Sequence, residues 1–597
     1  MCGFIGKISN SDINIDKIKD SNGHLICRGP DSTKIFNQRI NNLNVLLIFN
    51  RLKIVDLSDN ANQPMQNPET ESVIVFNGEI FNHLELRNNL EKQGLKFNTK
   101  NSDTEVLLKG LDFYGIDYIN KLRGQFSFCF INRKLQTAYI VSDRFNQKPM
   151  YFNFQNDSFT FSSNLISLVN SLKNVNLSNK YISEYIEYGI VSSPNTVFEN
   201  VYKLEPAQVI EIDLLNVNKI NKSYIYWDVV HYVDSKKFKE EEFFEYLDDA
   251  IKIRQQADVP IANFLSGGID STSIIKNMHD RGDNINSFSI VFNEPKYNEM
   301  KWSRLVADRY QTNHTEINAS TNLDIETINN ALNSLDEPYA DPSVVPSYII
   351  SDKISKYYKV AISGDGGDEL LGGYKRVQDL LRPRTYLENV ISKGYNFYPP
   401  FLGSGNFFLS KSVNLNSAYN SFFQDEKFIN LLKIESNKNF KKIRLDLNFE
   451  PYKSMLIQDY KYYLPEMMML KVDRTSMANS LEVRSPFVDH LLVQYIMSTG
   501  LHSDRLNINK TVLKKYLTND FSNTFINRKK QGFIFDLEKW IYGNIPIIKD
   551  RIIDGKYTNF ISKKIIFLLS INKSRINANR IWKLYLLEVY LSKFKFL

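Results

Sequence analysis

The protein is a chain of 597 residues, of which 43% are hydrophobic and 24% are charged. This length predicts two to four domains of about 150 residues each, and the composition excludes a disordered polymer, a fibrous repeat and a small disulfide scaffold. The 74 basic and 67 acidic residues give a formal net charge of +7, which no long basic block concentrates. We therefore expect no nucleic-acid partner.

The cysteines and the amino terminus indicate a cellular compartment. The chain has three cysteines, Cys2, Cys27 and Cys129. An odd and small number is typical of a reducing compartment rather than of a disulfide framework. The sequence contains no apolar run long enough to span a membrane, and its amino terminus does not read as a signal peptide. We expect a cytoplasmic protein with no membrane partner.

Five short apolar runs bounded by turn residues predict strands in the first part of the chain. They are residues 44–49, 72–76, 126–131, 137–141 and 158–161. Between them, residues 83–93 and 104–114 have the apolar spacing of helices. This mixture predicts an α+β domain built from packed antiparallel sheets.

The pattern changes after about Trp227, where strands and helices begin to alternate. Helices are predicted over 240–253, from Ser271 and over 299–310, and strands over 259–265, 286–292 and 358–362. Such alternation predicts an α/β domain with a parallel sheet covered by helices. Beyond Gly373 the sequence is mostly helical. We place the domain boundary between residues 215 and 216.

The second residue is a cysteine that becomes amino-terminal if Met1 is removed. An α-amine titrating at about 7.7–8.0 and a thiol titrating at about 8.5 can then share a proton near neutral pH. Taken alone, Cys2 is more simply explained as an ordinary small residue. Its interpretation therefore depends on residues further along the chain.

Polar clusters beside the predicted strands could hold a free amino acid that carries a carboxamide. They are residues 28–31, 51–56, 77–82 and 102–105. Arg51 can clamp an α-carboxylate and Asp103 can pair with an α-ammonium. The Asn77 amide and the Gly78 backbone N–H could form an oxyanion hole. A turn that needs positive φ would also explain Gly78 and is compatible with that role.

Together with Cys2, these clusters resemble the glutaminase domain of the class II glutamine amidotransferases. The resemblance implies an N-terminal-nucleophile sandwich in which Cys2 attacks the side-chain carboxamide of glutamine. It also implies a glutamine pocket, whose residues are Arg51, Asn77, Gly78, Glu79 and Asp103.

A glycine-rich loop follows the strand that ends at Leu265. Its sequence is Ser266-Gly267-Gly268-Ile269-Asp270-Ser271-Thr272, and a predicted helix comes next. Backbone N–H groups and a helix N-terminus at such a loop favour an anion, although a capped Gly-rich turn is the alternative. No Gly-Lys-Ser/Thr follows, so it is not a Walker A loop. It resembles the pyrophosphate loop of ATP pyrophosphatases, which adenylate a carboxylate.

A second loop of similar character follows the strand over 358–362. It reads Ser363-Gly364-Asp365-Gly366-Gly367-Asp368-Glu369. In a parallel sheet both loops would lie beyond the carboxyl ends of strands, where ligands bind. Asp270 and Asp368 are then candidate ligands for a Mg²⁺ that bridges phosphates. The alternative is a solvated acidic turn.

Nearly the whole chain resembles the glutamine-hydrolysing asparagine synthetases. The stretches that carry the resemblance beyond Cys2 and the two loops are residues 336–343, 464–466, 471–477, 482–487 and 529–533. It implies that Leu265, Ile290, Ser363 and Gly364 contact ATP along with Ser266, Gly267, Gly268, Asp270 and Ser271. It further implies that Asp365 assists acyl-adenylate formation, that Lys530 stabilises developing charge, and that the chain forms a homodimer. Without the family, Lys530 would be one of two surface lysines.

The chain departs from the family pattern at positions in or beside its first domain. Cys27 stands where a histidine is common, and Asn146 stands where glycine is usual. Asn164 and Ser167 replace the usual Glu and Lys, and Ala207 follows Pro206 where a Pro-Gly turn is usual. These departures put the expected coupling between the two domains in question more than either half-reaction, glutamine hydrolysis or ATP-dependent amidation.

The predicted function is ATP- and glutamine-dependent amidation of a carboxylate through an acyl-adenylate, with ammonia passed inside the protein. Aspartate is the expected acceptor, and a sugar uronate of surface-polysaccharide synthesis is the alternative within the enzyme class. A non-catalytic regulatory or scaffolding paralogue is an alternative of another class. Intact Cys2, Ser266-Gly267-Gly268 and Asp365 argue against that paralogue. A plain glutaminase would not need the phosphate loop.

Overall fold

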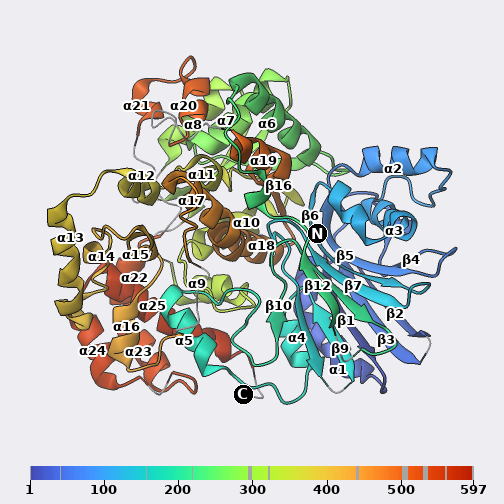
Figure 1. Cartoon of the computed structure of the whole chain (residues 1–597), viewed down its shortest axis with the longest axis horizontal. Helices are drawn as coiled ribbons and strands as arrows, with labels where there is room; N and C mark the ends of the chain where they lie inside the picture. Colours follow the sequence, from blue (N-terminus) through green and yellow to red (C-terminus); the bar gives the residue numbers. More distant parts are fainter. Residues whose placement is uncertain are drawn as a thin grey trace.

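A computed structural model gives the structure of the chain (Figure 1). It describes residues 2–40, 42–155, 157–217, 220–292, 299–319, 323–437, 443–499, 509–528, 535–558 and 561–594. Antiparallel strands from the first part of the chain lie on one side, and helices from its last third lie on the other. The chain's N-terminus lies at the junction between them.

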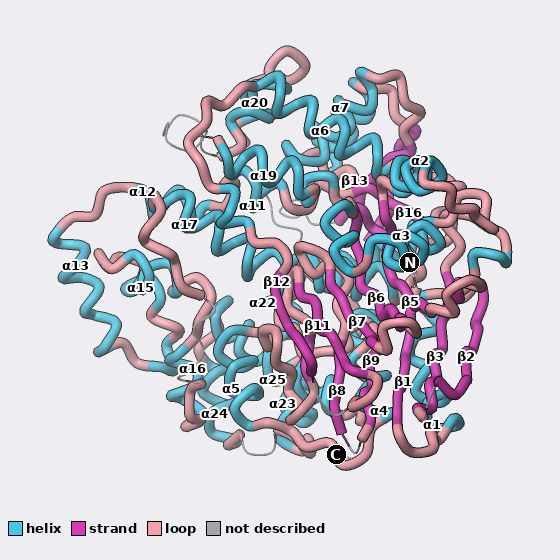
Figure 2. The backbone as a smooth tube through the Cα atoms, turned by 45° about the vertical axis from the view of Figure 1, so that its right-hand side comes forward, coloured by secondary structure: helices cyan, strands magenta, loops and turns pink. Residues whose placement is uncertain are grey.

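The first part of the chain is a sandwich of two antiparallel six-stranded sheets, ordered β10-β8-β9-β1-β3-β2 and β12-β11-β7-β6-β5-β4 (Figure 2). The bounds of the first sheet are β1 Gly3–Ser9, β2 Ser32–Ile40, β3 Leu43–Arg51, β8 Tyr151–Gln155, β9 Ser158–Ser162 and β10 Tyr202–Lys203. Those of the second are β4 Met65–Gln66, β5 Val73–Ile80, β6 Gly124–Asn132, β7 Thr137–Ser142, β11 Gln208–Asp213 and β12 Ile220–Ile225. All pairings within the two sheets are antiparallel.

Helices cover both outer faces of the sandwich, which gives four layers. A buried core that includes Phe4, Phe49 and Ile140 lies between the sheets. Helix α1 (Ile15–Asn22) packs beside α4 (Leu165–Ser171) on the first sheet, and α2 (His83–Lys92) and α3 (Asp103–Tyr114) cover the second. Because strand side chains alternate between faces, Phe4 joins the inner core while Ile5 packs against α1. The predicted antiparallel sandwich is confirmed.

The second part is built on a five-stranded sheet ordered β15-β14-β13-β16-β17, with every pairing parallel. Its strands are β13 Ile261–Phe264, β14 Asn286–Phe292, β15 Asn313–Ala319, β16 Val360–Ile362 and β17 Glu482–Arg484. The helices that alternate with them include α6 Glu240–Arg254, α7 Ile269–Asp280, α8 Met300–Arg309, α9 Ile325–Asn333 and α10 Val344–Ile354. The predicted parallel sheet with covering helices is confirmed. Sequence patterns did not identify β15 and β17, the two edge strands.

The rest of the chain is helical, as predicted. Its helices are α11 Gly367–Leu371, α12 Lys375–Leu381, α13 Tyr386–Ser392, α14 Asn406–Leu409, α15 Leu415–Asn420, α16 Glu426–Leu432, α17 Pro451–Gln458, α18 Leu470–Met477, α19 His490–Ser498, α20 Thr511–Leu517, α21 Asn523–Ile526, α22 Leu537–Gly543, α23 Ile545–Ile553, α24 Lys563–Ile571 and α25 Arg575–Leu591. Among the described residues, none of the helices is both long and apolar enough to cross a membrane.

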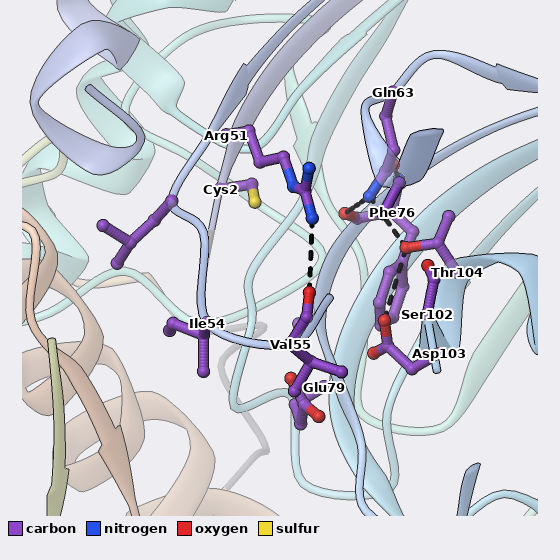
Figure 3. A pocket seen from close by; sticks show the side chains of 13 residues that line it. Cys2, Arg51, Ile54, Val55, Gln63, Phe76, Glu79, Ser102, Asp103 and Thr104 are labelled. Carbon is purple, nitrogen blue, oxygen red and sulfur yellow. Dashed lines mark hydrogen bonds between the residues drawn. The ribbon is translucent and has the colours of Figure 1, made fainter. Parts of the chain in front are cut away.

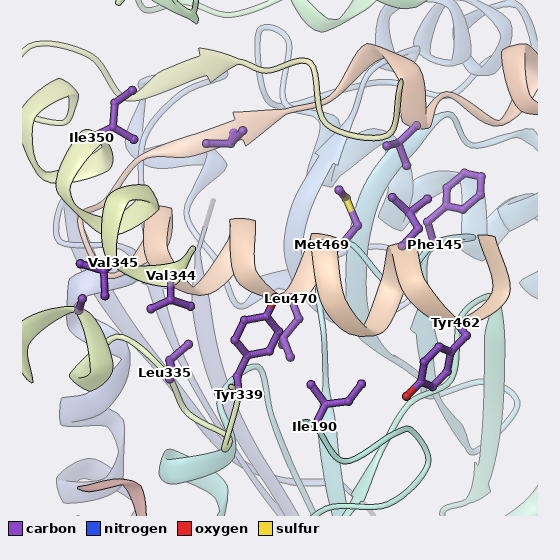
Figure 4. Packing of buried hydrophobic residues seen from close by; sticks show 14 of the residues in the cluster. Phe145, Ile190, Leu335, Tyr339, Val344, Val345, Ile350, Tyr462, Met469 and Leu470 are labelled. Atoms are coloured by element: carbon purple, nitrogen blue, oxygen red, sulfur yellow. The ribbon is translucent and has the colours of Figure 1, made fainter. Parts of the chain in front are cut away.

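One continuous helical run packs against both halves of the protein. The π-helix η7 (Asp459–Met469) leads directly into α18. Met469 and Leu470 on this run share one buried cluster with Phe145 and Ile190 of the first part and Val344 of the second (Figure 4). The two halves therefore share a hydrophobic core, which fixes the positions of loops contributed by each.

Candidate functional site

Cys2 is buried immediately before β1, next to Asn77 of β5. Its backbone N–H donates to the Asn77 Oδ1 atom at 3.1 Å. The Nδ2 atom of Asn77 is buried and makes no hydrogen bond within the described part of the chain. An unpaired buried donor costs free energy unless a ligand uses it, so Asn77 is suited to bind an oxygen beside the thiol.

Gly78 follows Asn77 at a position that only glycine can occupy. Its φ is +150°, and a Cβ atom there would lie 2.0 Å from the carbonyl oxygen of Gln125 on the neighbouring strand. This crowding gives a structural reason for the glycine, in addition to the expected oxyanion role of its N–H group.

The five residues predicted to bind glutamine lie around Cys2. Arg51, Gly78, Glu79 and Asp103 line one pocket together with Cys2 (Figure 3), and Asn77 bonds to the backbone of Cys2. The predicted clusters 51–56 and 102–105 also contribute Leu52, Ile54, Val55, Ser102 and Thr104 to the lining, whereas sequence reasoning missed Ala61, Gln63 and Phe76. The structure thus brings together residues that are separated by up to about a hundred positions in the chain.

Backbone carbonyls hold Arg51 in the pocket wall. Its Nη1 atom donates to the Ser58 carbonyl at 2.7 Å, and its Nη2 atom donates to the Val55 carbonyl at 3.2 Å. These neutral partners fix the guanidinium without cancelling its charge. A charge held in this way can attract the carboxylate of an amino acid.

Two buried carboxyl groups face the same pocket. Burial raises the pKa of Glu79 well above its usual value, and neighbouring Asp103 raises it further. Burial also raises the pKa of Asp103, which accepts the Ile80 N–H at 3.1 Å. A positive ligand group would relieve the repulsion between these carboxylates, so the pocket favours an ammonium group.

The Cys2 thiol experiences opposing influences. Burial raises its pKa, while the positive charge of the chain's amino terminus and of Arg51 lowers it. A thiol in a buried site needs a base close by to become a nucleophile. Removal of Met1 would place that base, the α-amine, on Cys2 itself.

Residues of the second half contact Arg28 and Glu79 of the first half, which lie beside and within the pocket. The Arg28 Nε atom donates to the Cys2 carbonyl at 3.2 Å, and its Nη1 atom forms a 2.9 Å ion pair with Asp473 on α18. Arg484 on β17 places its Nη2 atom 3.7 Å from the Glu79 Oε2 atom. The cluster at 28–31 was among those expected to hold the amino acid, but motif spacing did not indicate that Asp473 and Arg484 contact this region.

The two predicted phosphate loops lie side by side at the carboxyl ends of β13 and β16. A Cβ atom on Gly364 would lie 3.0 Å from both the Asp270 Cβ atom and the Ser271 nitrogen. Gly267 has a φ of +70°, and Gly268 donates its N–H to the Ser266 Oγ atom at 3.1 Å. Glycines thus allow this close approach.

The other residues predicted to contact ATP surround these loops. Leu265 is buried and donates its N–H to the Phe288 carbonyl at 2.8 Å, and Ile290 lies on the same strand as Phe288, β14. The Ser363 hydroxyl donates to the Asp365 Oδ2 atom at 2.8 Å. The predicted ATP residues therefore form one neighbourhood at the sheet edge where α/β proteins bind ligands.

Asp270 and Asp368, the predicted metal ligands, are bridged by a lysine that sequence reasoning missed. The Lys510 Nζ atom lies 2.5 Å from the Asp270 Oδ2 atom and 2.6 Å from the Asp368 Oδ1 atom. The described residues contain no group of three side chains that could hold a metal ion. A carboxylate pair around one cation is nevertheless suited to Mg²⁺, which takes its other ligands from phosphates and water.

The predicted catalytic Lys530 lies outside the described residues. The described residue nearest to it in sequence is Arg528, whose Nη2 atom donates to the Gly267 carbonyl at 2.8 Å. Arg528 also lies over the rings of Trp302 and Phe525.

Two departures from the family pattern lie at left-handed backbone positions. Asn146 has a φ of +49° and Ala207 a φ of +56°, which explains why glycine is usual at both sites. Asn164 caps α4 by accepting the Ser167 N–H at 2.9 Å. Cys27 is exposed.

Comparison with known protein families decides the assignment. The Asparagine synthase family matches residues 242–583, and the Glutamine amidotransferase domain family matches residues 1–227. The chain belongs to the asparagine synthase family. This membership identifies it as an enzyme that uses ATP and glutamine for amidation of the asparagine synthetase type, and the predicted N-terminal-nucleophile and ATP-pyrophosphatase domains are those of the family.

Two Bacillus subtilis proteins are similar to this asparagine synthase-family chain. Glutamine-hydrolyzing asparagine synthetase 1 is 27% identical over 99% of the chain and 96% of the relative. Glutamine-hydrolyzing asparagine synthetase 2 is 26% identical over 90% of the chain and 72% of the relative. Among solved structures, the allosteric regulatory enzyme of purine biosynthesis is 12% identical with a TM-score of 0.29, covering 53% of the chain and 80% of that structure.

Proposed function

We propose that the protein converts aspartate to asparagine, using glutamine as the nitrogen donor and ATP as the activating substrate, through a β-aspartyl adenylate. The observation that carries this proposal is that one chain holds both a pocket lined by Cys2, Arg51, Glu79 and Asp103 and a pair of adjacent glycine-rich loops with the carboxylates Asp270 and Asp368. We also propose a cytoplasmic homodimer as the working form. We move the domain boundary expected between residues 215 and 216 to a point after β12, because β12 (Ile220–Ile225) pairs with β11 in the second sheet of the sandwich.

In the glutaminase half, Cys2 is the nucleophile. Its Sγ atom attacks the carboxamide carbon of glutamine and gives its proton to the α-amine exposed by Met1 removal. Asn77 Nδ2 and the Gly78 N–H stabilise the oxyanion. The protonated α-amine then gives its proton to the leaving nitrogen, so that collapse of the oxyanion releases ammonia and leaves a thioester that water hydrolyses. Arg51 binds the substrate's α-carboxylate, and Asp103 with Glu79 binds its α-ammonium.

In the synthetase half, the acceptor carboxylate attacks the α-phosphorus of ATP and pyrophosphate leaves. Ser266, Gly267, Gly268 and Ser271 hold the phosphates at the N-terminus of α7. Asp270 and Asp368 are the residues that would hold Mg²⁺, which supplies charge neutralisation of the leaving pyrophosphate. Lys510 must give up at least one carboxylate when the cation binds.

Ammonia then displaces AMP from the adenylate, which forms the amide. Asp365 and Lys530 are proposed to assist these steps on the synthetase side. We propose that ammonia passes through the interface between the halves, because ammonium in water is a poor nucleophile. The shared core at η7 and α18 supports this route by excluding solvent between the halves.

The deciding experiment measures AMP, pyrophosphate and asparagine with purified protein, ATP, Mg²⁺ and glutamine, with and without aspartate. Aspartate-dependent AMP with an equal amount of asparagine is the expected result. Glutamine hydrolysis without aspartate-dependent AMP would move the acceptor to another carboxylate, with nucleotide-sugar uronates tested next. Formation of ADP instead of AMP would overturn the adenylate mechanism.

A further inference from the structure

A single residue of β17, Arg484, contacts both candidate sites. Its side chain is fully buried among polar partners from three parts of the chain. The Nε atom donates to Glu482 Oε1 at 2.6 Å, and the Nη1 atom donates to the carbonyls of Arg254 at 2.9 Å and Gln256 at 2.7 Å. These bonds fix the guanidinium in one orientation.

The remaining nitrogen of Arg484 points to the glutaminase half. Its Nη2 atom lies 3.7 Å from the Glu79 Oε2 atom, and neither Nη2 nor Glu79 Oε1 makes a hydrogen bond among the described residues. Glu79 lines the pocket that holds Cys2. At this point the two halves are therefore joined by an ion pair whose nitrogen–oxygen distance of 3.7 Å can still decrease.

The backbone of Arg484 supports the ATP loop. Its carbonyl accepts the N–H of Ser363 at 3.0 Å, where β17 runs parallel to β16. The next hydroxyl, Ser485 Oγ, lies 3.0 Å from Ser363 Oγ, which in turn donates to Asp365. A displacement of β17 would move the residue that begins the second phosphate loop.

We propose that Arg484 is a positioning residue for both sites. Its guanidinium pairs with Glu79 in the glutamine pocket, and its backbone carbonyl accepts the N–H of Ser363 in the ATP loop. Through these two contacts, bound glutamine tightens ATP binding. This inference rests on the proposed function, because it takes glutamine and ATP as the ligands of the two pockets.

Electrostatic attraction explains why bound glutamine should tighten ATP binding rather than weaken it. The groups that face Glu79 are Asp103, Glu482, Arg484 and the chain's amino terminus. The α-ammonium of glutamine adds a positive charge beside Glu79 and Asp103, which lowers the cost of keeping both ionised. An ionised Glu79 attracts Arg484 more strongly and holds β17 against β16.

The test measures ATP affinity in a chain that binds glutamine without hydrolysing it. In a Cys2→Ala background, the Kd of ATP with Mg²⁺ is determined by calorimetry without any acceptor, in the absence and presence of saturating glutamine. We expect glutamine to lower the Kd about fivefold, a typical size for coupling between sites. By reciprocity, ATP lowers the Kd of glutamine by the same factor.

Two further variants decide whether Arg484 carries the coupling. Adding Arg484→Lys keeps the charge but loses the fixed planar geometry, and we expect the coupling to fall below twofold while both ligands still bind. Adding Lys359→Gln instead removes a different ion pair between the halves, Lys359 Nζ to Asp31 Oδ2 at 2.7 Å, next to β16. That control should keep the fivefold coupling, because Lys359 does not contact Glu79.

The remaining possible results distinguish a failure of the inference from a failure of the proposed function. Full coupling in the Arg484→Lys chain, or no coupling in the Cys2→Ala chain when both ligands bind, overturns the inference and leaves the proposed function standing. Failure of glutamine or ATP to bind the Cys2→Ala chain overturns the proposed function and the inference with it. If Arg484→Lys lowers the melting temperature, Glu79→Gln at saturating glutamine tests the same pair from its other end, and retained coupling there counts against it.

Discussion

Arg28 and Asp473 are 445 positions apart, yet their side chains form a two-point ion pair with distances of 2.9 and 3.1 Å. Lys148 and Arg474 also contact the Asp473 carboxylate, at 3.0 and 2.7 Å. Although burial raises the pKa of Asp473, these three cations hold it well below its usual range. Because Arg28 also bonds to the carbonyl of Cys2, the position of Cys2 depends on contacts with the second half.

Asp473→Asn should therefore damage stability and glutamine use together. Removing one partner from a buried ion pair typically costs about 3 kcal/mol or more, because the cations left behind stay buried. Chemical denaturation measures the loss in stability, and glutamate release measures the loss in glutaminase rate. Lys359→Gln, at an exposed pair between the halves, should cost less than about 1 kcal/mol. Equal effects of the two variants would contradict this assignment.

Cys2→Ala should abolish glutamine-dependent amide formation and leave ammonia-dependent formation intact. The physical reason is that, in the proposed mechanism, the thiol acts only on glutamine, while the adenylate forms in the other half. Product assays with either nitrogen source measure both activities. Cys27→Ala is the matched control, since Cys27 is exposed and should have no effect. Loss of both activities in Cys2→Ala would argue against separate sites.

Asp270→Asn should remove the synthetase reaction and preserve glutamine hydrolysis. The change halves the carboxylate charge available to a bridging cation, and we expect at least about a 100-fold loss of AMP formation. Glutamate release by the same preparation serves as the internal control. A variant that still forms AMP at the normal rate would show that Asp270 does not hold the cation.

Ala207→Gly should stabilise the protein by about 1 kcal/mol, because alanine is strained at its φ of +56°. Thermal or urea unfolding measures the gain. Ala138 provides the contrast, since it is buried within β7 and has no such strain. Ala138→Gly should destabilise by about 0.5–1 kcal/mol, the ordinary cost of glycine within a strand. A destabilised Ala207→Gly protein would contradict the strain argument.

The free energy of unfolding should decrease at low pH, in part because Glu482 becomes protonated. Burial favours its neutral form, but the amino terminus, Arg484 and Lys148 lower its pKa to about 2. A carboxyl whose folded-state pKa is depressed stabilises the fold above its unfolded pKa, and that contribution is lost as pH falls toward the folded value. Glu482→Gln should thus flatten the dependence of stability on pH between about 4.5 and 2. An unchanged slope in denaturation curves across that window would refute the pairing.

Much of the fold could be predicted because its signals are local. The apolar runs over 44–49 and 126–131 became parts of β3 and β6, and the helical spacing over 240–253 became α6. The short strand β17 was missed, since Glu482-Val483-Arg484 has the polarity of a surface segment and is buried only because β16 and the glutaminase half cover it. Local pattern cannot report burial that arises from distant segments.

The candidate site likewise has features that the sequence predicted and features that appeared only in the tertiary structure. Residue types, motif positions and the family resemblance they carry were enough to predict the nucleophile, the glutamine pocket and the two phosphate loops, because each prediction depends on a particular chemical group next to a strand end. The bridge of Lys510 between Asp270 and Asp368, the Arg28–Asp473 pair and the reach of Arg484 to Glu79 were decided only by the tertiary structure. Charge pairing acts through space, so these partners carry no mark in the sequence until the two halves pack together.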